Sequence, residues 1–327
     1  MSLSRRLFLA SATAASAAAL LPGGLGTVAS ADHHKGHGGK GKKGMKPARD
    51  NATDGKPYKI SLAQWSLHRT IRAGELDPID FPKFARTEFD IGGVEYVNQF
   101  FKDKANDEAY LSEMKKRGDD HDVSHVLIMV DGEGRLGDPS GKARKQAVDQ
   151  HVKWLDAAKF LGCHSIRVNA ASEGSWEQQR DHAADGLRRL GEEAEAYGLN
   201  VLVENHGGLS SNGEWLASVM KYADHPLVGT LPDFGNFIID RKTGEAFDRY
   251  RGLELLMPYA EAVSAKTYGF DGEGNETTID YPRMMKTVLE NDYHSWVGIE
   301  WEGNDPGEIE GIKQTKALLE RLQGELG

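Results

Sequence analysis

The chain has 327 residues, of which 39% are hydrophobic and 28% charged, enough for one large domain with its own core. Its single cysteine, Cys163, excludes an internal disulfide framework and a thiolate metal cluster, so we expect it to be buried and unpaired. Beyond the first 56 residues, which hold nine Lys and Arg and three Asp, the chain carries 31 basic and 47 acidic residues, and this excess of 16 negative charges argues against nucleic acid as a partner.

The N-terminal residues have the pattern of an export signal. Arg5 and Arg6 precede an Ala-rich apolar stretch that ends at Ala29-Ser30-Ala31, a typical cleavage site. The paired arginines resemble the twin-arginine type of signal, so we expect residues 1–31 to be a signal peptide and the mature protein to be periplasmic or secreted. The alternative is an N-terminal membrane anchor, for which the apolar run is short. No later segment is apolar enough for a stable membrane span.

The segment that follows, residues 32–56, is rich in His, Gly and Lys and cannot bury apolar surface. We expect it to be a flexible linker. A weak metal-binding tail is the alternative, because His33, His34 and His37 lie within five positions.

From residue 57 to residue 327, short apolar runs alternate with longer amphipathic ones. The expected strands are Lys59–Gln64, Gly93–Val97, Val123–Met129, Ser165–Asn169, Asn200–Glu204, Val228–Leu231, Ala262–Thr267 and Val297–Trp301. The clearest helical patterns are Ala143–Leu161, Trp176–Tyr197, Gly213–Tyr222, Tyr281–Glu290 and Ile309–Leu322. Eight strand–helix units of this spacing predict a single (β/α)8 barrel with a parallel eight-stranded core. A doubly wound open sheet is less consistent, because none of the loops resembles a dinucleotide-binding turn. The one Gly-x-Gly-x-x-Gly spacing after an expected strand, at residues 132–137, leads into Asp138-Pro139 and not directly into a helical pattern.

Polar residues gather where the predicted strands end, which is the catalytic face of such a barrel. Glu204, Asp233 and Glu300 follow the fifth, sixth and eighth strands, and three converging carboxylates would repel one another strongly. A divalent ion resolves this repulsion; carboxylates favour Mn2+ or Mg2+, and an imidazole from His206 would also admit Co2+, Fe2+ or Zn2+. The alternative for each carboxylate taken singly is a helix cap or an ion pair.

Three segments carry a family resemblance: Glu-Asn-His-Gly-Gly at 204–208, Leu-Pro-Asp-Phe-Gly-Asn-Phe at 231–237 and Gly-Ile-Glu-Trp-Glu-Gly at 298–303. They resemble the xylose isomerase-like TIM-barrel superfamily, within it the sugar phosphate isomerase/epimerase group, over essentially all of residues 57–327. The resemblance implies Glu204, Asp233 and Glu300 as metal ligands. Where many relatives have a fourth ligand, a His, this chain has Ser264, so His206 or water would complete the shell, or Lys266 would take part of the cation's role.

The resemblance also implies a reaction, namely proton transfer next to the carbonyl of a sugar or polyol substrate. In the resembling epimerases the two metal-bound Glu residues move the proton, which here implies Glu204 and Glu300. His206 and Lys266 would assist as acid or oxyanion partners. The expected substrate-binding residues are Glu95, Arg167, Asn169, Trp65, Asn236 and Trp301, with Phe234 as a further candidate for stacking on a sugar ring. Core packing for the aromatic residues, and an internal Arg167–Glu95 ion pair, are the alternatives.

Two other functions remain open from the sequence. The first is a lyase or dehydratase, in which the same enolate expels a leaving group from a keto-glycoside or inosose. The second is a non-catalytic sugar-binding barrel, favoured by the Ser at the usual His position. A DNA-repair nuclease of the same superfamily is disfavoured by the acidic charge and by the scarcity of His ligands. The sequence carries no signal of an oligomeric state.

Overall fold

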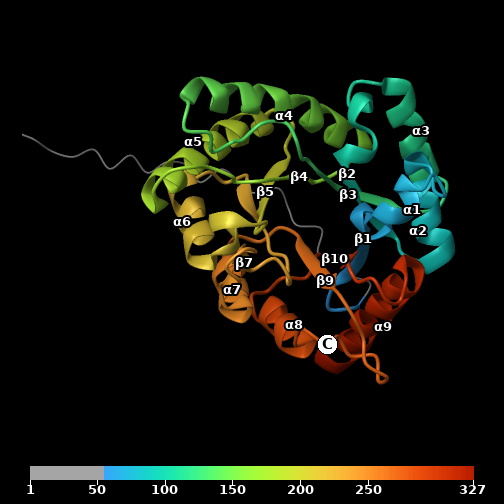
Figure 1. Ribbon diagram of the computed structural model, residues 1–327. Coiled ribbons are helices and arrows are strands. Elements are labelled where there is room, and N and C mark those ends of the chain that lie inside the picture. Colours follow the sequence, from blue (N-terminus) through green and yellow to red (C-terminus); the bar gives the residue numbers. More distant parts are fainter. Residues whose placement is uncertain (1–54) are drawn as a thin grey trace, which may run out of the picture. The chain divides into compact units, whose positions relative to one another are not determined.

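The computed structural model describes residues 55–327, so the predicted signal peptide and most of the predicted linker lie outside the described residues. Eight parallel strands alternate with helices that surround them (Figure 1). The strands are β1 (Lys59–Ala63), β2 (Gly93–Val97), β3 (Ser124–Met129), β4 (Ser165–Val168), β5 (Asn200–Glu204), β6 (Val228–Leu231), β9 (Val263–Thr267) and β10 (Trp296–Trp301). The helices are α1 (His68–Arg72), α2 (Phe81–Phe89), α3 (Glu108–Asp119), α4 (Gly141–Leu161), α5 (Trp176–Glu195), α6 (Gly213–Ala223), α7 (Arg249–Leu256), α8 (Tyr281–Glu290) and α9 (Glu308–Leu326).

The strands form a closed ring. Their order in the sheet is β6-β5-β4-β3-β2-β1-β10-β9, with every pair parallel. The two ends of this order meet through isolated parallel bridges, Thr230 with Ala260 and Asp233 with Ser264. The predicted (β/α)8 barrel is therefore confirmed, and each expected strand lies within two residues of its observed bounds.

Local sequence signals account for the helix ends that lead into and out of the strands. Ser175 caps α5 as half of a capping box with Gln178, which satisfies backbone groups that have no partner inside the helix. α4 ends at Gly162, whose φ of 89° is the left-handed conformation that favours glycine. The chain then turns into β4, which begins at Ser165.

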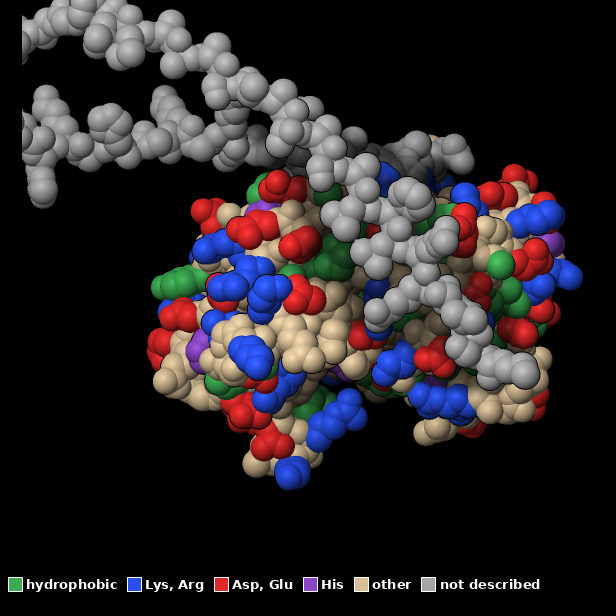
Figure 2. Space-filling model, turned by 90° about the horizontal axis from the view of Figure 1, so that it is seen from above, with side chains coloured by type: hydrophobic (Ala, Val, Ile, Leu, Met, Phe, Trp, Pro, Cys, Tyr) green, Lys and Arg blue, Asp and Glu red, His purple; other side chains and the backbone are tan. Residues whose placement is uncertain are grey.

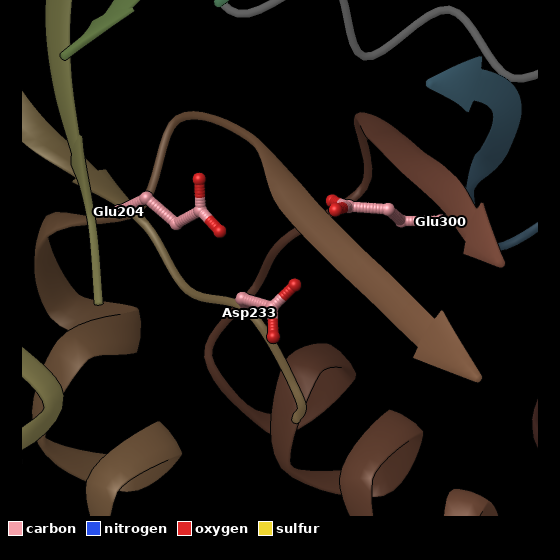
Figure 3. Close-up of side chains that lie close together, drawn as sticks. All are labelled: Glu204, Asp233 and Glu300. Atoms are coloured by element: carbon pink, nitrogen blue, oxygen red, sulfur yellow. The ribbon is translucent and has the colours of Figure 1, made fainter. Parts of the chain in front are cut away.

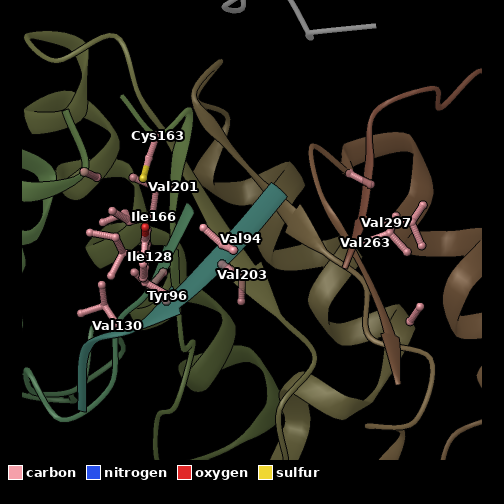
Figure 4. Close-up of a cluster of buried hydrophobic side chains, with 14 of the residues drawn as sticks. Val94, Tyr96, Ile128, Val130, Cys163, Ile166, Val201, Val203, Val263 and Val297 are labelled. Carbon is pink, nitrogen blue, oxygen red and sulfur yellow. The ribbon is translucent and has the colours of Figure 1, made fainter. Parts of the chain in front are cut away.

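Alternation along each strand divides the side chains into two environments. Along β5, Val201 and Val203 point outward and pack under the helices, whereas Leu202 and Glu204 point into the barrel. Figure 4 shows the outer layer, in which Cys163 is buried and unpaired, as predicted. The larger apolar cluster therefore lies between sheet and helices, and the barrel interior holds the polar residues together with a smaller apolar cluster that includes Leu202.

Two features go beyond the sequence prediction. A short antiparallel hairpin, β7 (Ile238–Asp240) and β8 (Glu245–Ala246), is inserted between β6 and α7. Together with the five helices named from the sequence, α2, α3 and α7 complete the ring of helices around the strands.

Within residues 55–327, no helix is both long and apolar enough to cross a membrane. On the face in Figure 2, acidic and basic side chains intermix, and hydrophobic ones form only small patches among the described residues.

Candidate active site

Three carboxylates converge at the carboxyl ends of the strands. Glu204 ends β5, Asp233 follows β6 and Glu300 lies near the end of β10; one oxygen from each falls within 4.8 Å of the others. Their exposed fractions are 1%, 0% and 5%. Figure 3 shows Glu204 and Glu300 reaching toward each other from opposite sides, with Asp233 beside the gap between them. The predicted convergence is therefore present, in a setting where unbalanced charge is costly.

Ser264 links two of these carboxylates. Its Oγ lies 2.7 Å from Asp233 Oδ2 and 3.0 Å from Glu300 Oε2. A hydroxyl donates only one hydrogen bond, so the second contact is favourable only if one carboxyl keeps a proton. Burial is the main cause that raises the pKa of Asp233 to about 7, opposed by Lys266 and reinforced by Glu300 and Glu204. Burial likewise raises the pKa of Glu300.

Asp233 is held by the loop that contains it. Its Oδ1 accepts hydrogen bonds of 2.8 Å from the backbone N–H groups of Gly235 and Asn236. The side chain of Asn205, which directly follows β5, donates to the carbonyl groups of Asp233 and Asn236 and accepts from the N–H of Asp233. The β5 and β6 loops are thus fixed to each other, and with them the first two carboxylates.

Glu204 lies between an amide and a guanidinium. Asn236 Nδ2 donates a 2.8 Å hydrogen bond to its Oε1. Arg167 Nε lies 2.7 Å from its Oε2, yet neither atom has a hydrogen-bond partner, so this is an ion pair without an aligned N–H. Arg167 also pairs with Asp131 at 2.8 Å. The structure therefore places Arg167 against Asp131 and Glu204, where the sequence analysis offered Glu95 as an internal partner.

Lys266 projects its ammonium group into the same cluster. Its Nζ lies 3.2 Å from Glu300 Oε1, 3.3 Å from Glu302 Oε2 and 3.6 Å from Asp233 Oδ2. Burial opposes its charge, but the surrounding carboxylates outweigh burial and raise the pKa of Lys266 well above its ordinary value. Glu302 was not assigned a role from the sequence, although its place two residues after Glu300, directly after the end of β10, would have identified it.

His206 lies at the rim of the site. It is exposed, its Nδ1 is 3.2 Å from Asn169 Oδ1, and among the described residues it does not belong to the group of close ligand atoms. Asn169 in turn donates to Asp131 Oδ1 at 2.6 Å. Asp131, missed by sequence reasoning, follows β3 by two residues, so the strand-end rule that found the other carboxylates would have found it.

Glu95 lies deeper in the barrel. It is 1% exposed, accepts a 2.6 Å hydrogen bond from Ser61 at Oε1, and has no hydrogen-bond partner at Oε2. A Cβ on Gly298 would come within 2.3 Å of its carboxylate, so the glycine leaves the space that this side chain fills. Burial raises the pKa of Glu95 to about 8, reinforced by Glu300 and Glu204. The expected contact with substrate is not supported, because Glu95 lines neither cavity at the barrel mouth.

Of the predicted aromatic residues, only Trp65 faces the site. Its Nε1 donates a 2.7 Å hydrogen bond to Glu302. Trp301 is fully buried, stacks on Phe270 and packs against Gly311 of α9, which corrects the expectation that its ring meets a substrate. Alternation on β10 is the reason, since Glu300 and Trp301 must point to opposite faces. Phe234 is also fully buried and packs against Tyr281.

Two cavities open over the carboxylates. The first, which we call the reaction cavity, has about 300 Å³ and is lined by Trp65, Gln99, Met129, Asp131, Arg167 and Glu300. The second, which we call the side cavity, has about 460 Å³ and is lined by Ser211, Gly235, Asn236, Ile238, Arg241 and Tyr268. His206 and Glu302 line both, so these two residues form the boundary between them.

The donor set fits a divalent cation. Glu204, Asp233 and Glu300 supply oxygens at close range, and the buried Oε2 of Glu204 has no hydrogen-bond donor aligned on it. Five carboxyl groups at the mouth face two fixed positive charges; the carboxyls are those of Asp131, Glu204, Asp233, Glu300 and Glu302, and the cations are Lys266 and Arg167. An added cation would offset this excess, and carboxylate oxygens suit Mn2+ or Mg2+.

A protein-family model described as a xylose isomerase-like TIM barrel matches residues 85–323. The chain belongs to this family. The match includes all the carboxylates of the cluster. It confirms the resemblance inferred from the strand-end segments.

Similar proteins are also found among curated sequences and solved structures. A C-glycoside deglycosidase alpha subunit of Arthrobacter globiformis is 35% identical over 72 residues, which span 20% of each protein. The structure of a 3-keto-D-glucoside 4-epimerase from E. coli has a TM-score of 0.63 and 15% identity, covering 81% of this chain and 99% of that one. The IOLI protein, crystallised with a zinc atom, has a TM-score of 0.60 and 13% identity, covering 82% and 98%.

Proposed function

We propose that this protein is a metal-dependent sugar isomerase or epimerase, which moves a proton at a carbon next to the carbonyl of a sugar or keto-sugar. The convergence of Glu204, Asp233 and Glu300 within 4.8 Å carries this proposal. The family membership and the sugar epimerase among similar structures support it.

The proposed roles follow from how the carboxylates are held. Glu204 and Glu300 approach the gap between them from opposite sides, so one can remove a proton that the other returns on the opposite face of the carbon. The raised pKa of Glu300, caused by burial, suits a group that must hold a proton during turnover. Asp233 is locked by two backbone N–H groups and suits a ligand better than a moving base.

A divalent ion held by Glu204, Asp233 and Glu300 would supply Lewis-acid stabilisation of negative charge on the substrate oxygens. Arg167 and Lys266 hold positive charge beside the carboxylate oxygens of Glu204 and Glu300 and balance the negative charge of these two groups. Trp65 offers an aromatic wall on the reaction cavity for the apolar face of a sugar ring. His206, at the rim, is close enough to the cavity to assist as an acid.

A lyase acting on a keto-glycoside is the second candidate. The observation that favours it is the 35% identity to a C-glycoside deglycosidase alpha subunit over 72 residues. Both candidates begin with removal of a proton next to a carbonyl, and they differ in whether a group then leaves the neighbouring carbon. The proposed proton-transfer residues are the same for both.

The test is a screen of the purified protein against ketoses, inososes and keto-glycosides in D2O with added Mn2+. NMR would detect deuterium at the carbon next to the carbonyl, which reports proton transfer even when little product accumulates. New sugar isomers would indicate an isomerase, and a released aglycone would indicate a lyase. We expect exchange with at least one keto-sugar and its loss on chelation.

Glu300→Gln preserves the shape of the side chain and removes the base. We expect it to fold normally and to lower exchange by about 10²- to 10⁴-fold. Glu310→Gln, on the exposed first turn of α9, is the matched control and should leave exchange unchanged. If exchange is absent with every substrate, or is indifferent to both metal and Glu300→Gln, the protein is a sugar-binding barrel instead.

A further inference from the structure

The side cavity is larger than the reaction cavity and adjoins it. It has about 460 Å³ against about 300 Å³, and His206 and Glu302 line both. Asn236 joins the side cavity to the carboxylates, because it lines this cavity and also donates to Glu204. A ligand pocket of about 300 Å³ is at the small end of the usual range, so the added space is substantial.

The wall of the side cavity is built by the β7–β8 hairpin and by β9. Phe237, at the base of the hairpin, is 2% exposed and packs closely on Gly252 of α7. The N–H of Phe247 donates to the carbonyl of Phe237 at 2.8 Å and closes the hairpin base. The Oγ of Ser211, from the turn after β5, donates to the Asn236 carbonyl at 2.7 Å. The wall is therefore fixed by packing and hydrogen bonds.

Two of the side chains that this wall presents, those of Ile238 and Arg241, have no evident role in holding the fold, whereas the third, Tyr268, also packs against the core. Ile238 is 43% exposed, one of three large hydrophobic residues so exposed among the described residues. Arg241 is exposed and makes no hydrogen bond or ion pair within the described part of the chain. Tyr268 adds a half-buried phenol ring. An apolar surface, an aromatic ring and a free guanidinium fit a second ring that carries hydroxyl or carboxyl acceptors.

We propose that the substrate is a glycoside, with its reacting sugar in the reaction cavity and its aglycone in the side cavity between Ile238, Arg241 and Tyr268. This inference rests on the proposed function and adds the substrate class. A free monosaccharide would leave the side cavity empty. An aryl group and a second sugar share the required chemistry, and the test separates them.

The test compares methyl, phenyl and glucosyl 3-keto-glucosides, which share the reacting sugar and differ only in the aglycone. We expect kcat/KM for the deuterium exchange to be about tenfold higher for the phenyl or the glucosyl compound than for the methyl one, equivalent to about 1.4 kcal/mol. The preferred compound identifies the aglycone as aromatic or as a sugar. The double variant Ile238→Ala/Arg241→Ala should lose most of this preference and leave the methyl compound unaffected.

Lys242→Ala is the matched control, since Lys242 lies on the same hairpin turn and does not line the side cavity. It should keep the full preference. Equal kcat/KM values for the three compounds, or a preference that survives the double variant, would overturn the inference while the exchange of the methyl compound upholds the proposed function. Absence of exchange with every compound and with free keto-sugars would overturn both.

Discussion

The ammonium nitrogen of Lys266 lies 3.2 Å from Oε1 of Glu300, and the lysine side chain is only 2% exposed. A fixed positive charge is thus built into the carboxylate cluster before any ion binds. At such burial an ion pair contributes by preventing an uncompensated charge more than by net attraction. The same ammonium also repels a divalent ion, so its two effects have opposite signs and can be separated.

Replacing Lys266 with Met should separate its two effects, which are the compensation of the buried carboxylates and the repulsion of a divalent ion. In chelator, we expect the free energy of unfolding to fall by about 3–5 kcal/mol, because removing one partner leaves buried carboxylates unpaired. With Mn2+ present, the variant should bind the ion more tightly than the native protein. Chemical denaturation and calorimetry measure the two effects. Unchanged stability of the Lys266→Met variant in chelator would contradict the compensating role. Lys313→Met, which removes the surface ion pair with Glu88, is the control and should change stability little.

Metal affinity should depend on pH through Asp233. Its pKa is raised to about 7, mainly by burial, and a protonated carboxyl does not ligate. Below pH 7 the ion competes with this proton, so we expect affinity to rise about tenfold per pH unit up to about 7 and to level off above. Titration calorimetry with Mn2+ at pH 5.5, 6.5 and 8 would measure this. A flat profile would be inconsistent with Asp233 as a protonated ligand.

Glu95 should make the protein less stable as pH rises. Its pKa in the folded state is about 8, above the ordinary value of 4.5, so between these values the folded state holds a proton that the unfolded state has released. Its contribution to the free energy of unfolding is present below pH 4.5 and is lost as pH rises through 8, about 5 kcal/mol in all. Glu95→Gln, which cannot ionise, should remove this loss. Chemical denaturation at pH 5 and pH 8 in chelator measures the free energy of unfolding of both proteins. An equal change in this free energy between the two pH values for the native protein and for Glu95→Gln would refute the prediction.

Export by the twin-arginine route remains a prediction for residues outside the described part of the chain. It rests on Arg5 and Arg6 upstream of the Ala29-Ser30-Ala31 site. We expect the substitution of both arginines by lysine to abolish export and cleavage near Asp32. Cell fractionation with N-terminal sequencing of the mature protein would check this. Normal export of the Lys-Lys variant would show that another route is used.

The sequence predicted the barrel and the three central carboxylates because both follow from local rules. Strand–helix alternation defines the fold, and the strand-end rule places Glu204, Asp233 and Glu300 at one face. The position of His206 at the rim could not be predicted in this way, since it depends on the path of a loop. The error over Trp301 was avoidable, because alternation with Glu300 turns its ring toward α9.

The contacts among the charged side chains of the site could not be predicted from the sequence. That Lys266 reaches three carboxylates, and that Ser264 joins two of them, depends on side chains of β9 meeting those of β10 and the β6 loop. The hairpin β7–β8 is only five residues of strand and has no pattern distinct from a loop. Only the structure shows that Phe237 packs on α7 at the base of this hairpin and that Ile238 and Arg241 of the hairpin line the side cavity.

The carboxylate cluster depends on the closure of the barrel between β6 and β9. Asp233 and Ser264 form one of the two bridges that join the ends of the strand order, and the N–H of Phe234 donates to the Ser264 carbonyl there. Asp233 and Ser264 therefore have two roles: their backbones close the barrel between β6 and β9, and their side chains are hydrogen-bonded within the carboxylate cluster. Partial opening of the barrel at this seam would dismantle the carboxylate cluster while the other strand pairs persist. Under mild denaturant, activity should therefore disappear together with amide protection at Phe234 and Ser264, ahead of global unfolding.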